Sequence, residues 1–143
     1  MKAFKIISVL AAIWALVGVP GFFNTLPPAL DYKIGYVLLV FGHAIAGLAI
    51  VAGAILTLKE KVNISKWLLV VGCAFAAYGK ITEGYHFQYP LFFSFKFSSF
   101  EGFKEFQNGY SIDFPFAILA GLLFCFSLSA EYEKAEQSVF TIP

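Results

Sequence analysis

Four ionisable residues interrupt apolar stretches of the chain, and their types are the ones that could do chemistry: His43, Lys80, Glu83 and His86. Histidine titrates near neutral pH and glutamate accepts protons, so His43 and Glu83 could together carry protons or bind a cation. Two histidines and a glutamate are also suitable metal ligands by type, but nothing in their spacing selects a metal. A haem held between His43 and His86 is disfavoured, because helical spacing offsets the two residues by about 8 Å along the axis. The sequence therefore predicts no metal and no cofactor.

Recognisable catalytic motifs are absent from the sequence. It contains no G-x-S-x-G, H-E-x-x-H or C-x-x-C pattern and no glycine-rich phosphate loop, so we predict no catalytic residues. Cys73 and Cys125 both stand within apolar runs, which excludes a disulfide-stapled secreted domain and a thiolate zinc site. An enzymatic activity is not expected from these patterns.

The composition indicates which solvent surrounds these residues. The chain has 143 residues, of which 59% are hydrophobic and only 13% are charged. Soluble domains carry about 25% charged residues, so this chain has too few of them to cover its surface in water. All ten basic residues are lysine and the net charge is +1, which excludes a nucleic-acid-binding protein because no arginine is available for phosphates or base edges. The chain is expected to lie in a lipid bilayer.

Four apolar windows are long enough to cross the roughly 30 Å hydrocarbon layer, and they cover residues 4–23, 35–58, 67–86 and 114–130. In lipid, a helix satisfies every backbone N–H and C=O within its own segment, so the windows are expected to be helices rather than strands. The predicted fold is therefore all-α: an integral membrane four-helix bundle that forms a single transmembrane domain over residues 1–143.

The lysines predict how this bundle is oriented, because cytoplasmic flanks are enriched in positive charge. The lysines expected on the cytoplasmic side flank the first window, the connection between the second and third windows, and the end of the fourth: Lys2, Lys5, Lys59, Lys61, Lys66 and Lys134. Both termini are thus expected in the cytoplasm. A multi-pass protein of a bacterial inner membrane is the favoured location, and an organellar membrane is the alternative.

Small residues recur at helical spacing along the two middle windows. Helices in lipid associate where small residues let their backbones approach closely, so these stripes are expected to pack against each other. The predicted packing residues are Gly42, Ala46, Ala49, Gly53, Gly72, Ala76 and Gly79. Counting along the helices brings His43 and Glu83 to a similar depth, with Lys80 and His86 one turn to either side of Glu83. The alternative is that this cluster lies near the interface, where Lys80 snorkels and Glu83 meets water.

The connection from residue 87 to residue 112 is rich in phenylalanine and is expected on the outer side. Phe93, Phe95 and Phe97 alternate with polar residues, which predicts an extended segment with its rings on one side. Phe100, Phe103 and Phe106 recur every three residues, which predicts a short amphipathic helix that ends at Asn108-Gly109. Such an apolar face must be covered, either by the lipid interface or by a partner subunit.

Several positions in the second, third and fourth windows also carry a family resemblance: Tyr36, His43, Ala44, Gly53, Ala54, Glu83, Asn108, Gly109, Phe114 and Phe116. They resemble the uncharacterised bacterial family described as predicted small integral membrane proteins, which have four helices and about this length. The family has an acidic residue where His43 stands, an arginine where Pro115 stands, and a longer first outer loop than residues 24–33. The resemblance implies the four-helix topology and singles out His43 and Glu83, but it implies no reaction. The layout is more remotely similar to DoxX-like four-helix membrane proteins.

Three functions remain open from the sequence. The favoured hypothesis is a non-enzymatic accessory or scaffolding subunit of a larger membrane assembly, whose partners are membrane lipids and other membrane protein subunits. The second hypothesis is a small unit that transports protons, cations or a solute and uses His43 and Glu83. The third is a redox or quinone-associated subunit, with the aromatic outer mouth as the quinone site and His43 as its hydrogen-bonding group.

Overall fold

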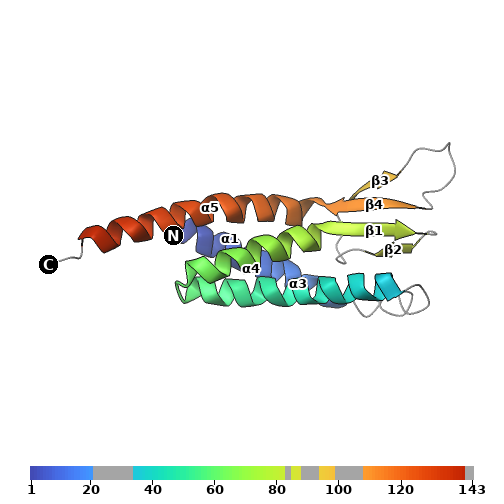
Figure 1. Ribbon diagram of the computed structural model, residues 1–143, viewed down its shortest axis with the longest axis horizontal. Helices are drawn as coiled ribbons and strands as arrows, with labels where there is room; N and C mark the ends of the chain where they lie inside the picture. Colours follow the sequence, from blue (N-terminus) through green and yellow to red (C-terminus); the bar gives the residue numbers. More distant parts are fainter. Residues whose placement is uncertain (21–33, 83–84, 88–93, 99–107, 141–143) are drawn as a thin grey trace.

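The computed structural model describes residues 1–20, 34–82, 85–87, 94–98 and 108–140. Within these ranges the chain is mostly helical and contains four helices: α1 (Lys2–Val17), α3 (Ile34–Leu58), α4 (Val62–Ala77) and α5 (Phe114–Phe140). It also contains four strands: β1 (Tyr78–Thr82), β2 (Tyr85–Phe87), β3 (Ser94–Ser98) and β4 (Asn108–Asp113). The helices lie side by side, and the sheet extends from one end of them (Figure 1).

The helices form a closed bundle, because α3 packs on α1 and α4, and α5 packs on α4 and α1. The second predicted window is confirmed as α3, and the fourth is confirmed but continues ten residues beyond Ala130 to Phe140. The first helix ends at Val17, and residues 21–23 of its window lie outside the described residues. Among the described residues, α3 and the segment Phe114–Glu133 of α5 are the two helices long and apolar enough to cross a membrane, and α4 is apolar but shorter.

The third window was wrong at both ends. Its helix, α4, begins at Val62 and ends at Ala77, nine residues before the predicted end at His86. Tyr78 is already extended, with φ −81° and ψ 135°, and the chain continues from there as β1. Gly79 is a poor helix former, while Ile81 and Thr82 are β-branched and favour strands. The prediction rested on hydropathy, and an apolar run does not distinguish a helix from a buried strand. The predicted window therefore extended beyond the end of the helix.

The sheet is antiparallel throughout, with the strand order β2-β1-β4-β3. The extended segment predicted around Phe95 and Phe97 is confirmed as β3, which pairs with β4. Asn108 and Gly109, which were predicted to end a short helix, begin β4, and the predicted helix itself lies outside the described residues. The remaining phenylalanines of the predicted outer face lie outside the described residues: Phe93, Phe100, Phe103 and Phe106.

Two helices pass into two strands without an intervening loop. Helix α4 ends at Ala77 and β1 begins at Tyr78, while β4 ends at Asp113 and α5 begins at Phe114. The two helix–strand units lie side by side, because α4 packs on α5 and Tyr78 pairs with Ile112 in the sheet (Figure 1). The sheet is therefore a direct continuation of the bundle.

The helices bury many small residues together with a few large ones, such as Phe4 and Phe116, and expose many large apolar residues. The small buried residues of the bundle include Ser8, Ala11, Ala15, Ala46, Ala54, Thr57, Cys73 and Ala76. In contrast, Leu48 is 71% exposed and Ile45 is 66% exposed. Soluble helices normally place their large apolar residues inside. Here the large apolar side chains cover the outside of all four helices.

The predicted packing stripe is largely confirmed between α3 and α4. A Cβ added at Gly42, Gly53 or Gly72 would come within 2.8–2.9 Å of a side-chain atom of the facing helix. Ala46 and Ala76 are buried, and Ala49 is half-buried. Gly79 was wrongly assigned to this stripe: it is buried, but it lies in β1 opposite Ser111.

Helix α3 ends in a Schellman motif that makes the turn to α4 very short. The N–H of Lys61 donates to the carbonyl of Leu56, and the N–H of Glu60 donates to the carbonyl of Thr57. Glu60 adopts φ 61°, the left-handed conformation that this motif requires and that glycine adopts without strain.

Replacing Glu60 by glycine is expected to give a protein about 1 kcal/mol more stable than replacing it by alanine, because only alanine retains the strain at positive φ. Both variants lose the ion pair of Glu60, so their difference isolates the backbone term. The measurement is the free energy of unfolding in detergent micelles. Equal stability of the two variants would show that the left-handed residue costs nothing here.

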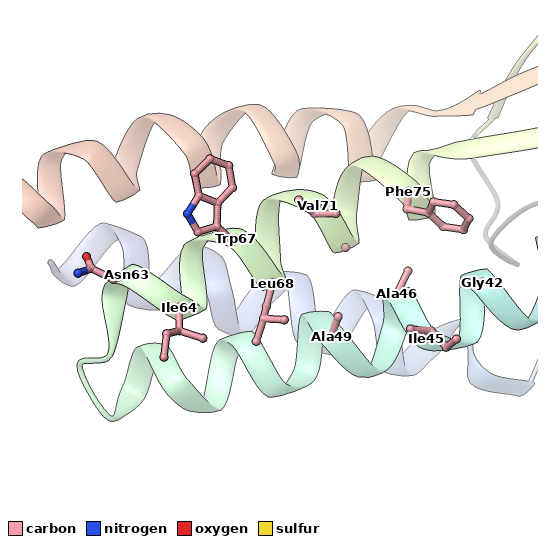
Figure 2. Close-up of a pocket in the computed structure, with 11 residues that line it drawn as sticks. Gly42, Ile45, Ala46, Ala49, Asn63, Ile64, Trp67, Leu68, Val71 and Phe75 are labelled. Atoms are coloured by element: carbon pink, nitrogen blue, oxygen red, sulfur yellow. The ribbon is translucent and has the colours of Figure 1, made fainter.

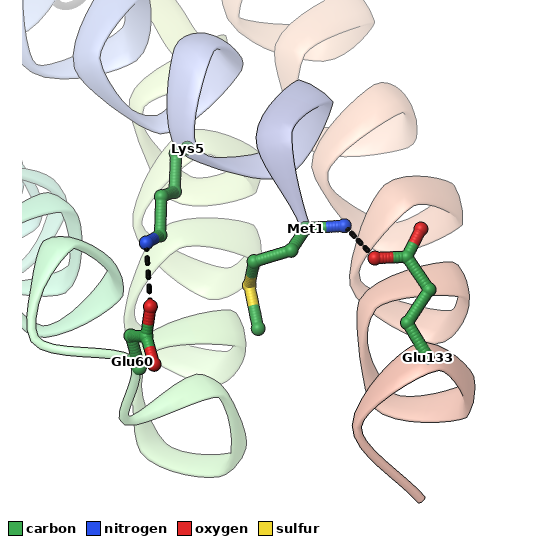
Figure 3. Close-up of polar contacts among 4 residues, drawn as sticks. All are labelled: Met1, Lys5, Glu60 and Glu133. Atoms are coloured by element: carbon green, nitrogen blue, oxygen red, sulfur yellow. Dashed lines mark hydrogen bonds and ion pairs between the residues drawn. The ribbon is translucent and has the colours of Figure 1, made fainter. Parts of the chain in front are cut away.

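Ion pairs join the helices at the end of the bundle opposite the sheet. Lys5 of α1 contacts Glu60 of the α3–α4 turn at 2.8 Å, and the N-terminal ammonium of Met1 contacts Glu133 of α5 (Figure 3). A third pair joins Lys66 of α4 to Glu131 of α5 at 2.6 Å and is partly buried. The predicted lysine-rich side of the bundle is therefore a single charged end in which two lysines and the N-terminal ammonium have acidic partners.

Candidate functional site at the helix–sheet junction

Buried polar side chains gather where the bundle meets the sheet. His43 of α3 is 1% exposed, while Ser111 and Asp113 of β4 have no exposed surface. The strands join the two places. Tyr78 pairs with Ile112 of β4, and the next residue, Gly79, pairs with Ser111. Polar groups buried in this way must be satisfied by hydrogen bonds or carry an energetic cost. The junction therefore contains a buried imidazole, a buried hydroxyl and a buried carboxyl.

His43 ties α3 to the point where α4 becomes β1. Its Nε2 lies 2.7 Å from the carbonyl oxygen of Tyr78, and since a carbonyl only accepts, we assign the proton to Nε2. The imidazole also packs against the ring of Phe75, with 5.5 Å between ring centroids and 60° between planes. The arrangement satisfies a carbonyl at the end of a helix with a side chain from the neighbouring helix. The primary role of His43 in this geometry is to fix the junction.

Asp113 caps the first turn of α5. Its Oδ1 accepts a hydrogen bond from the N–H of Phe116 at 3.1 Å, the spacing of an N-cap residue to the third residue of the helix. Its Oδ2 is buried and has no hydrogen-bond partner in the described part of the chain. Burial raises the pKa of Asp113 from its ordinary value of 3.8 to about 6, although the hydrogen bond from Phe116 opposes the shift. Asp113 is thus the group of this junction that can change charge between pH 5 and 7.

Stability is expected to depend on pH through Asp113. Because the folded-state pKa of about 6 lies above the unfolded value near 3.8, the folded protein binds the proton more tightly. The stabilisation from this group is complete below about pH 4 and is lost as the pH rises through about 6. The measurement is the difference in unfolding free energy between the wild type and Asp113→Asn, because the asparagine keeps the cap without the charge.

The Asp113→Asn variant should gain stability relative to the wild type between about pH 4.5 and 7.5, and Asp113→Ala should be about 1 kcal/mol less stable than Asp113→Asn at every pH through the missing cap. A wild-type minus Asp113→Asn difference that stays constant over this pH range would contradict the prediction.

The predicted ionisable cluster is only partly within the described structure. His43 is buried as expected, but Lys80 lies in β1 and His86 in β2, so the helical spacing assumed for them does not exist. His86 pairs with Ile81 across the β1–β2 hairpin. Glu83 lies outside the described residues. The structure thus places His43 at the start of β1, the strand that contains Lys80 and pairs with the strand of His86.

Sequence reasoning missed Asp113, although a local signal for it was present. Asp113 precedes Phe114-Pro115, and an aspartate followed by a proline in the first helical turn is a common start of a helix. Ser111 carries no comparable signal, because its burial depends on the pairing of β4 with β1 and β3. No cluster of three or more His, Cys, Asp or Glu side chains that could hold a metal occurs among the described residues.

No family model, curated protein or solved structure matches this chain. The resemblance to the small integral membrane family stays a prediction.

Proposed function

We propose that this chain is an integral membrane protein whose four helices hold a sheet at one side of the bilayer, and that it works without catalysis as an accessory or scaffolding subunit of a membrane assembly. The observation that carries the membrane assignment is the number of large apolar side chains on the outside of the bundle. Phe4, Phe116 and other large residues are buried with the small ones, but many large apolar residues, such as Leu48 and Phe124, face outward. Leaving each such side chain in water forgoes about 1.5–3 kcal/mol, whereas lipid tails accept them.

The polar groups of the bundle support the same assignment by their spacing. From Asp113 to Glu131, α5 rises through 18 residues, or about 27 Å, which is close to the roughly 30 Å of a hydrocarbon layer. The Lys66–Glu131 and Lys5–Glu60 ion pairs lie at one limit of this layer. The buried polar junction lies at the other. α4 rises only about 24 Å, but it continues directly into β1.

The native cysteines allow a direct test. Cys125 is exposed on α5 between the two polar limits, about 18 Å from Asp113 and about 9 Å from Glu131 along the helix, and Cys73 is buried. In membranes, Cys125 is expected to resist a membrane-impermeant maleimide, because lipid covers it. A cysteine at Glu136, exposed further along the same helix, is expected to react in a Cys125→Ser background. Labelling of Cys125 in membranes as fast as of position 136 would refute the membrane assignment.

The same reagent tests the orientation. We propose that both termini are cytoplasmic, so position 136 should be labelled only after the cells are permeabilised. Ile112 is 43% exposed at the sheet end of the bundle. A cysteine at this position should be labelled in intact cells. The reverse pattern would place the sheet in the cytoplasm.

The scaffolding role rests on how the sheet is mounted. Because α4 runs into β1 and β4 runs into α5, the two central strands are held at a fixed place relative to the bundle. The described sheet ends in β2 on one side and β3 on the other. Sheet edges offer unpaired backbone groups to which a partner can add a strand. A stiffly mounted sheet with such an edge is suited to hold another protein.

Purification in mild detergent tests this role. We expect the wild-type chain to elute together with other membrane proteins, and a variant with residues 94–98 replaced by a Gly-Ser segment of equal length to lose them. The control is Ile118→Ala, which changes a side chain 50% exposed on the bundle and leaves β3 intact. A chain that elutes alone, or partners that remain bound to the variant without β3, would contradict a scaffold that acts through this edge.

A further inference from the structure

A long apolar groove runs along the surface between α3 and α4. Its volume is 650 Å³, which is within the range of pockets that bind lipid- or drug-sized molecules. Its floor contains the small residues Gly42, Ala46, Ala49 and Gly72, and large side chains such as Trp67 and Phe75 also line it. The small residues thus have two effects. The glycines let α3 and α4 approach closely, and the small side chains on the outer side leave a groove between the helices.

The groove has two different ends. Figure 2 shows Asn63 at the end near the α3–α4 turn, and Phe75 with Gly42 at the end near the sheet. The Phe75 ring would lie 2.8 Å from a Cβ at Gly42, so it fills the space above that residue and closes this end. From Asn63 to Phe75, α4 rises through 12 residues, or about 18 Å. One leaflet is about half of the roughly 30 Å hydrocarbon layer, so the groove is about as long as one acyl chain.

Positive charge lies beside the open end. Lys59 and Lys61 are exposed in the turn that precedes Asn63, and no ion pair engages either ammonium group in the described part of the chain. The neighbouring Lys5 and Lys66, in contrast, are paired with glutamates. Trp67 lies one turn along α4 from Asn63, with the ammonium of Lys66 5.4 Å from its ring centroid, as in the aromatic belt at a membrane interface. The charges are thus placed where a lipid headgroup would lie.

The geometry points to a binding site for an anionic phospholipid, with one acyl chain in the α3–α4 groove and the phosphate beside Lys59 and Lys61. This inference rests on the proposed membrane location. A transmembrane helix from a partner fits the groove less well, because a helix is about 10 Å wide and would continue past Phe75 across the second leaflet. A lysine near an anionic headgroup contributes about 1 kcal/mol, so the two lysines favour an anionic lipid over a zwitterionic one.

The test uses the full chain reconstituted in vesicles that contain a phospholipid with a photoactivatable acyl chain. The headgroup is phosphatidylglycerol in one set of vesicles and phosphatidylcholine in the other. Adducts on the groove residues are quantified by peptide mass spectrometry. We expect more groove adducts with phosphatidylglycerol, by about fivefold for each lysine that contributes. Replacing Lys59 and Lys61 by glutamine should remove this preference, and both residues are exposed, so the fold should not change.

A matched pair of variants tests the groove itself. Ala49→Phe fills the channel from a half-buried position, and Ala52→Phe places the same side chain on an exposed position of α3 that does not line the groove. Ala49→Phe should lose the groove adducts, and Ala52→Phe should keep them. Equal adducts in both variants, or no preference for phosphatidylglycerol in the wild type, would overturn the lipid site.

Two further outcomes separate this inference from the proposed function. Protection of Cys125 in the same vesicles reports membrane insertion independently of the groove. If Cys125 is protected and the groove adducts are absent, the lipid site fails while the membrane assignment holds; if Cys125 is labelled, both fail. An Ala49→Cys variant in a Cys125→Ser background that forms disulfide-linked dimers in membranes would place a second copy of the chain in the groove and also overturn the lipid site.

Discussion

Replacing Gly72 by leucine is expected to destabilise the bundle by about 1–3 kcal/mol, the range of an overpacked core. A Cβ at Gly72 would lie 2.9 Å from Cγ1 of Ile50 and 3.1 Å from the carbonyl oxygen of Ala46. The Ile50 side chain can rotate, but the backbone of α3 cannot move away without separating the two helices. In lipid this separation is costly, because close packing and not the exclusion of water holds the helices together.

Gly121 provides the matched control. It lies on α5 with no atom within 4 Å of its added Cβ, and it is exposed. Gly121→Leu should therefore be neutral or more stable by up to about 1 kcal/mol, because leucine favours a helix more than glycine does. The measurement is unfolding by SDS in mixed micelles, followed by circular dichroism. If both leucine variants unfold at the same SDS fraction, the close approach of α3 and α4 does not hold the bundle together.

Replacing His43 by leucine is expected to cost about 1–3 kcal/mol, because it leaves the Tyr78 carbonyl without its side-chain donor. Leucine is apolar and of similar size, so the loss of the hydrogen bond dominates over the loss of packing. The damage should be local to the junction. Amide hydrogen exchange should therefore accelerate first in β1 and at the end of α4, before the bundle itself opens.

His43→Gln tests whether this effect comes from the hydrogen bond. The glutamine amide can donate to the same carbonyl, so this variant should recover a large part of the stability and of the exchange protection. A leucine variant as well protected in β1 as the wild type would mean that His43 does not fix the junction.

The helical part of the fold was largely predictable from sequence, because length and apolarity suffice to find a long helix. α3 was predicted to within one residue, and the small residues of α3 and α4 correctly indicated a close contact. The sheet was not predicted. Its central strands are short and continuous with helices, and their pairing joins Tyr78 to Ile112, 34 residues further along the chain. Such long-range pairing leaves no local signal, apart from the alternation around Phe95 that indicated β3.

The surroundings of His43 were predictable only in part. A histidine inside an apolar helix was singled out, and helical counting placed it level with Glu83, which lies outside the described residues. Helix α4 ends at Ala77, and His43 contacts the carbonyl of Tyr78 there, a backbone group that no residue type indicates. Asp113 could have been found from Asp-Phe-Pro alone, but its burial depends on the sheet above it.

The passage of α4 into β1 and of β4 into α5 has a mechanical consequence. A loop between a helix and a strand would absorb a rotation of either element, but here each pair shares one uninterrupted backbone. If α4 tilts against α5, either the hydrogen bonds between β1 and β4 near the Tyr78–Ile112 pair are distorted, or the whole sheet rotates with the helices. If the bundle spans a bilayer as proposed, a change in bilayer thickness that tilts these two helices would move the far edge of the sheet, and the displacement would grow with the length of the strands.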